Sequence, residues 1–161
     1  MLNKLPDTAR VWVFQSNRML SESDQALMHH HMQKFIPDWA AHGKGLSGDY
    51  EVAENLFLIV GVDESRAMAS GCSIDSLTHK VKEIGALLEV DFFDRMAIAH
   101  VNNAGKIELT GMGHFKAMMQ RDEVGFGTTV FNNLVDNKKD LLENWKTKVK
   151  DSWHKNLVDI L

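Results

Sequence analysis

With 161 residues, 44% of them apolar and 25% charged, the chain has the composition of one globular domain, and we expect a single domain over residues 1–161. Its formal net charge is −4 and its acids and bases are interspersed, which excludes the basic surface that nucleic-acid binding requires. No window approaches the roughly 18 consecutive apolar residues of a membrane helix and the first residues hold no signal peptide, so we expect a cytoplasmic protein that does not insert into a membrane.

The first part of the chain predicts a strand, a helix and a hairpin. Residues 11–14 are a short apolar run rich in β-prone side chains, which is typical of a strand. Ser21 or Ser23 can cap the helix that follows, whose apolar residues recur at helical spacing as far as Trp39. Residues 50–53 and the apolar run that begins at residue 56 then predict a hairpin.

The second part predicts another helix and further strands. Ser73 is the expected cap of a helix that carries Leu77, Val81, Ile84 and Leu88 on one face. Residues 96–101 and 106–110 flank a polar turn, which indicates a second hairpin. A short helix over 113–120, a strand over 128–131 and a last helix are expected after it. This last helix begins near Asn137, with Leu142, Trp145, Val149 and Trp153 on one face.

The order of the predicted elements through residue 101 is strand, helix, strand, strand, helix, strand. This order is typical of a ferredoxin-like βαββαβ core, in which an antiparallel sheet carries its helices on one face. We therefore expect an α+β protein with a core over about residues 10–101 and a C-terminal β/α extension over 102–161.

The candidate site centres on Cys72, the only cysteine, in the segment Ser-Gly-Cys-Ser-Ile-Asp-Ser of residues 70–76. A single cysteine excludes an internal disulfide and fits a reducing compartment. The segment joins a buried strand to a helix N-terminus, where free N–H groups favour anions and a thiol ionises more easily. The predicted topology brings His42 and Lys44 to the same end of the sheet as this turn.

Two chemical interpretations of this site are open. In the first, the domain is not an enzyme and binds a small anionic ligand or a protein partner through six residues: Ser70, Cys72, Ser73, Asp75, His42 and Lys44. In the second, Cys72 is a nucleophile and His42 its general base. Asp75 argues against the second, because a carboxylate in the same helical turn disfavours a thiolate. A third interpretation is a structural subunit of an assembly, and the oligomeric state is left open.

Neither a cofactor nor a metal ion is expected. The glycine pairs of the chain do not continue into a dinucleotide-binding G-x-G-x-x-G, and no phosphate-binding G-x-x-x-x-G-K-[ST] occurs. His29, His30 and His31 are consecutive, so on a helix they point roughly 100° apart and cannot easily share one ion.

Several segments resemble an uncharacterised family of small bacterial cytoplasmic proteins. They are residues 11–18, 39–44, 70–76, 131–135, 143–145 and 151–154, and the Ser-Gly-Cys-Ser-Ile-Asp-Ser run is the most specific of them. Members of that family often carry the label "ABC transporter ATPase". The residues of this chain do not support that label, because such an ATPase needs a phosphate-cradling loop with its lysine and its Mg²⁺-binding Ser or Thr. The resemblance therefore implies no catalytic residue.

Overall fold

In the computed structural model, which describes residues 1–157, the strand β5 (Phe57–Asp63) is the centre of a three-stranded antiparallel sheet. We call this the first sheet; its strand order is β1-β5-β4. Phe57 to Val62 are all buried, because both faces of this strand are covered. That burial accounts for the unbroken apolar run that predicts the strand.

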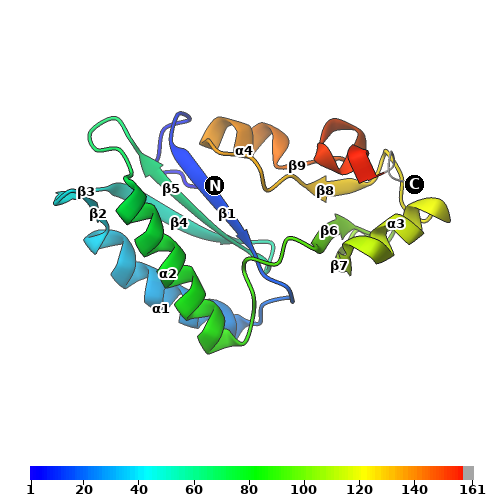
Figure 1. Cartoon of the computed structure of the whole chain (residues 1–161), viewed down its shortest axis with the longest axis horizontal. Coiled ribbons are helices and arrows are strands. Elements are labelled where there is room, and N and C mark those ends of the chain that lie inside the picture. Colours follow the sequence, from blue (N-terminus) through cyan, green and yellow to red (C-terminus); the bar gives the residue numbers. More distant parts are fainter. Residues whose placement is uncertain (158–161) are drawn as a thin grey trace.

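The fold is α+β, as the sequence predicts, with four α-helices and three antiparallel sheets among the described residues (Figure 1). The elements in chain order are β1 (Arg10–Gln15), α1 (Glu22–Asp38), β2 (Ala40–Ala41), β3 (Lys44–Gly45), β4 (Ser47–Ala53), β5, α2 (Gly71–Leu88), β6 (Ala97–Val101), β7 (Ile107–Gly111), α3 (Met112–Gln120), β8 (Thr129–Phe131), α4 (Lys138–Asn144), β9 (Lys146–Lys148) and the 3-10 turns η1 (Val149–Asp151) and η2 (Trp153–Leu157).

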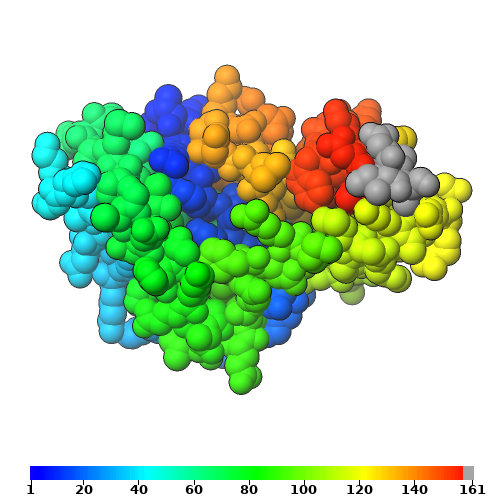
Figure 2. Space-filling view, in the orientation of Figure 1, coloured from blue at the N-terminus to red at the C-terminus, as the bar shows by residue number. Residues whose placement is uncertain are grey.

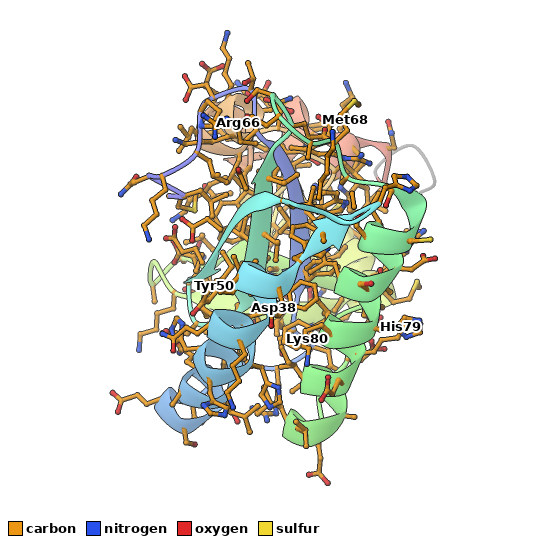
Figure 3. All side chains as sticks on the ribbon, turned by 90° about the vertical axis from the view of Figure 1, so that its left-hand side faces the viewer. Asp38, Tyr50, Arg66, Met68, His79 and Lys80 are labelled. Atoms are coloured by element: carbon orange, nitrogen blue, oxygen red, sulfur yellow. The ribbon has the colours of Figure 1, made fainter. Side chains whose placement is uncertain are left out.

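The helices α1 and α2 lie side by side over one face of the first sheet (Figures 1 and 3). Each begins with a capping box: Ser21 with Asp24 in α1, and Ser70 with Ser73 in α2. The predicted core face of α2 is confirmed, since Leu77, Val81, Ile84 and Leu88 are all buried. No helix within residues 1–157 combines the length and the apolarity that crossing a membrane requires.

A second, four-stranded antiparallel sheet has the strand order β7-β6-β8-β9. One of its faces packs under α3 and the two 3-10 turns, around Phe115, Val130 and Val149. Its other face meets the first sheet through a shared core that includes Phe57 and Phe131, whose ring centroids are 4.9 Å apart. The two sheets therefore form one continuous body, with helices on its outer sides (Figure 1).

The ferredoxin-like topology is not evident, because the fourth predicted strand leaves the first sheet. In a ferredoxin-like order β6 would lie beside β1, but both of its edges are taken by β7 and β8 in the second sheet. A side chain makes the hydrogen bond between β1 and β6: Nε2 of Gln15 donates to the C=O of Ala97 at 3.0 Å. A short turn joins β6 to β7, and the hairpin that results places β6 in the second sheet.

The prediction of one long last helix is also wrong. The helix α4 begins next to Asn137, as predicted, and Asn137 caps it, but it ends at Asn144, and residues 146–148 form an edge strand instead. The C=O of Trp145 accepts a hydrogen bond from Asn132 rather than continuing a helical pattern. The β-branched Thr147 fits this extended segment better than a helix.

Candidate functional site

The turn that holds Cys72 is organised by helix capping. The sequence predicts Ser73 as the cap, but the cap is Ser70. The helix begins at Gly71, which places Ser73 at its third position. The Oγ of Ser70 accepts a hydrogen bond from the N–H of Ser73 at 3.2 Å, and the Oγ of Ser73 accepts one from the N–H of Ser70 at 2.7 Å. The N–H groups of Ser70 and Ser73, which the sequence predicts to be free for an anion, are therefore already hydrogen-bonded within the cap.

Cys72 lies in the first turn of α2, whereas Asp75 is the fifth residue of the helix, so the carboxylate is not in the same turn as the thiol; both side chains are exposed and Ser73 is buried. The C=O of Cys72 accepts a hydrogen bond from Ser76, and no side chain within residues 1–157 makes a hydrogen bond to its sulfur. The thiol is therefore open to reagents in the folded protein.

His42 and Lys44 lie in the tight hairpin of β2 and β3, where both are exposed. His42 and Gly43 have φ angles of 51° and 77°, the left-handed pair that a two-residue hairpin turn requires. The hairpin lies near the start of α2, because the indole Nε1 of Trp39 donates to the C=O of Ser73 at 2.8 Å. Figure 3 shows the loop of Arg66 and Met68, which leads into α2, at the top of the view.

Larger hollows lie elsewhere, along the outer edge of β1. One cavity of about 610 Å³, which we call the edge cavity, lies between residues 10–14 and residues 133–137. A second of about 540 Å³, the inter-sheet cavity, lies between the end of β1 and the start of β6. The two share Val13, Phe14, Asn133 and Leu134 as lining residues. The space-filling view shows the N-terminal segment at the surface between green and orange segments (Figure 2).

The inter-sheet cavity has a mainly apolar and aromatic lining. Phe92, Phe93, Phe131 and Trp153 come to it from three separate parts of the chain. Phe93 is 39% exposed and Leu134 is 73% exposed, so apolar surface continues from the cavity to solvent. Its volume is that of pockets which hold small molecules.

A hydrogen-bonded pair of amides crosses this region and ties the two sheets together. Nδ2 of Asn133 donates to Oε1 of Gln15 at 2.9 Å. Oδ1 of Asn133 in turn accepts from Nε1 of Trp145 at 2.9 Å. Gln15 also donates to the C=O of Ala97, so its amide is satisfied on both sides. These contacts fix the shape of the cavity without leaving free amide groups in it.

Two charged side chains and one imidazole line the same cavity. Arg95 forms no ion pair within residues 1–157, whereas Asp94 accepts a hydrogen bond from the N–H of Met96 at 2.9 Å. His154 is buried, stacks on Trp153 with ring centroids 3.9 Å apart, and shares a 2.7 Å hydrogen bond with Ser152 through Nδ1. Burial lowers the pKa of His154 to about 4, so its ring is neutral at pH 7.

A third cavity, of about 490 Å³, lies at the far end of the second sheet, near Asn103, Asp122 and Glu123. Within the described part of the chain, no three His, Cys, Asp or Glu side chains gather into a group that could hold a metal ion. None of the three cavities is lined by Cys72, His42 or Lys44.

Sequence reasoning missed the inter-sheet cavity because its residues are far apart in the chain. Gln15 and Asn133 are separated by 118 positions, and no motif spacing connects them. Gln15, Asn133 and His154 reach the cavity from three segments, residues 11–18, 131–135 and 151–154. Comparisons with protein-family models, with curated proteins and with solved structures gave no match to this chain.

Proposed function

We propose that this domain binds a small ligand with an apolar body and an anionic group in the inter-sheet cavity. The observation that carries the proposal is the cavity itself, about 540 Å³ between two sheets, with aromatic walls and one cation. Pockets of this size with few polar groups are typical of small-molecule sites, and they often lie between structural units.

The aromatic walls supply most of the expected affinity. Phe93 is partly exposed, and its ring lies edge-on to that of Phe14 at a centroid distance of 5.7 Å. A flat or branched apolar body that covers Phe93 and Trp153 would remove this surface from water, at roughly 25 cal/mol per Å².

Arg95 supplies the preference for an anion. Its guanidinium is free of ion pairs within residues 1–157, and it presents a fork of N–H donors that matches a carboxylate, sulfonate or phosphate. Asp94 beside it opposes a second negative charge, which favours a ligand with a single anionic group. His154 is neutral at pH 7 and adds no charge.

The sequence-based proposal that the Cys72 turn and the His42–Lys44 loop bind a small anionic ligand or a protein partner stays a prediction. The thiol enzyme with Cys72 and His42 and the structural subunit also stay predictions. The inter-sheet cavity is preferred over the Cys72 turn because it encloses volume, whereas the side chains of Cys72, His42 and Lys44 are exposed. The resemblance to the uncharacterised bacterial family likewise stays a prediction.

A fluorescence titration tests the proposal. The probe is 8-anilinonaphthalene-1-sulfonate, which has an apolar body and one sulfonate, and its uncharged counterpart is N-phenyl-1-naphthylamine. We expect Arg95→Gln to weaken binding of the sulfonate about tenfold and to leave the uncharged probe unaffected. Phe93→Ala should weaken both probes.

The control is Arg66→Gln, which removes a cation from the exposed loop before α2 (Figure 3). If Arg66→Gln and Arg95→Gln affect the sulfonate equally, attraction to the anion is a property of the whole surface and the proposal is wrong. Dodecanoate should displace the probe from the wild-type protein, and failure to compete would also count against the cavity.

A further inference from the structure

The outer edge of β1 has backbone groups that face away from the first sheet. The N–H of Val11 donates to the C=O of Asp136, and the N–H of Lys138 donates to the C=O of Ala9, each at 2.9 Å. Backbone groups of alternate residues in an antiparallel strand point to the same edge. The groups of Val13 therefore also point outward, in line with those of Val11.

Beyond Val11 this edge is unpaired. Within residues 1–157, the C=O of Val11, the N–H and C=O of Val13 and the N–H of Gln15 have no hydrogen-bond partner. The edge cavity of about 610 Å³ lies along Val11 and Val13, between β1 and residues 133–137, and Gln15 lines the adjoining inter-sheet cavity. Val11 and Gln15 are buried and Val13 is partly buried, so a ligand that brings its own backbone reaches these four groups through the two cavities.

The other edge strands of the two sheets carry charged residues within their length, whereas the charge on β1 is confined to its first residue, Arg10. β4 carries Asp49 and Glu51, β7 carries Glu108, and β9 carries Lys146 and Lys148. Charges on edge strands are a common device that prevents unwanted strand addition. From Val11 to Gln15, β1 has no charged residue and no proline.

The open edge is also the position where a ferredoxin-like sheet would hold its fourth strand. In this protein β6 departs into the second sheet, which leaves β1 with one partner, β5. The short bridge of Arg10 with Asn137 shows that the edge accepts an antiparallel chain at its first residue. Among residues 1–157, the edge beyond this bridge has no backbone hydrogen-bond partner.

We propose that the edge of β1 from Val11 to Gln15 accepts an extended, uncharged segment of another polypeptide as an added β-strand. Addition of a strand satisfies the free backbone groups, and side chains at alternate positions of the segment determine specificity. One side of the segment faces the partly buried Val13 and the exposed Leu134, so it should be apolar there.

The geometry favours a single peptide over a second copy of this chain. Residues 133–137 wall the cavity along β1. A second copy that paired its own β1 with this edge would bring its own residues 133–137 into the same space. An extended segment of another protein carries no such wall.

Amide hydrogen exchange followed by NMR tests this proposal on the wild-type protein. In the free protein, the N–H groups of Val13 and Gln15 should exchange much faster than that of Val60 in the buried β5. The probe is an alternating Val-Thr hexapeptide with blocked ends, N-methylated at alternate residues so that only one of its edges can pair. At saturation it should slow exchange of both amides at least tenfold.

Two controls complete the experiment. The fully N-methylated hexapeptide cannot donate backbone hydrogen bonds and should not protect either amide. Val13→Pro removes an outward N–H and should weaken the peptide about tenfold, whereas Lys148→Pro removes one from the outer edge of β9 and should leave the affinity unchanged.

Slow exchange at Val13 and Gln15 in the free monomer would overturn the proposal, because the edge would then be covered. Protection in the free protein that appears only as the protein dimerises would overturn it in favour of a second copy. Equal effects of the two N-methylated peptides would show that side chains alone bind. The aromatic probes of the inter-sheet cavity do not need the β1 backbone, so their binding can succeed or fail independently.

Discussion

Asn133 donates a hydrogen bond from Nδ2 to Oε1 of Gln15 at 2.9 Å, across 118 positions of sequence. Gln15 ends β1 of the first sheet, and Asn133 follows β8 of the second. The same Asn133 accepts from the indole of Trp145, whose ring packs on Phe57 in the shared core. This one side chain therefore sets how the two sheets meet beside the inter-sheet cavity.

Asn133→Ala should destabilise the protein by about 1–3 kcal/mol, measured by urea unfolding. The substitution leaves the indole N–H of Trp145 and one side of the Gln15 amide without a partner in a part-buried place. In a double-mutant cycle with Gln15→Ala we expect a coupling of roughly 0.5–1.5 kcal/mol. Additive losses would show that the two amides act independently. Asn3→Ala, on an exposed residue, is the control.

Stability should fall as the pH is lowered through the range from 6.5 to 4. Burial lowers the pKa of His154 from 6.5 to about 4, so the unfolded chain takes up a proton at a higher pH than the folded one. The contribution is complete above pH 6.5 and is lost progressively below it, by up to about 3 kcal/mol. Burial also lowers the pKa of His100, which acts in the same direction. Urea unfolding at pH 7.5 and pH 5 measures this loss, and a flat profile would contradict it.

His100→Leu should increase stability. The His100 side chain is fully buried under Phe115, and neither ring nitrogen has a hydrogen-bond partner within the described residues. An apolar side chain of similar size removes the desolvation cost, which we expect to add about 1 kcal/mol at pH 7 and more at pH 5. The exposed His79→Leu is the matched control (Figure 3). A loss of stability in His100→Leu alone would mean that the ring has a polar partner.

Ser70→Ala should cost about 1 kcal/mol of stability. It removes the side chain that accepts from the N–H of Ser73 and breaks the capping box at the start of α2. Ser76→Ala, five residues after the first helical residue, should change stability by less than about 0.5 kcal/mol. Equal effects of the two substitutions would show that the cap contributes nothing measurable.

Cys72 should react completely with 5,5′-dithiobis(2-nitrobenzoate) in the folded protein, because its side chain is exposed. Iodoacetamide should modify the native thiol about as fast as the thiol of the urea-unfolded chain. Much faster native alkylation, lost in His42→Ala, would favour the thiol enzyme over a binding domain. Cys72→Ser should leave binding of the sulfonate probe unchanged, since Cys72 does not line the inter-sheet cavity.

Local elements were predictable because short-range chemistry determines them. The hairpin at Glu54 and Asn55, both with positive φ, is specified by its turn residues and by the β-prone runs on either side of it. The core face of α2 follows from helical spacing. The nearness of the Cys72 turn to the His42 hairpin also follows from strand direction, because it depends only on the order of the elements through α2.

By itself, the sequence determined the class of the fold, the main helices and strands, and the absence of a nucleotide-binding loop, since composition and period need only neighbouring residues. Only the tertiary structure decided where β6 pairs, because the choice between β1 and β8 depends on packing between residues 30 or more positions apart. That choice separates the sheets, opens the edge of β1 and creates the inter-sheet cavity. Long-range pairing of this kind has no periodic signature in the chain, and so the candidate site was beyond the reach of sequence reasoning.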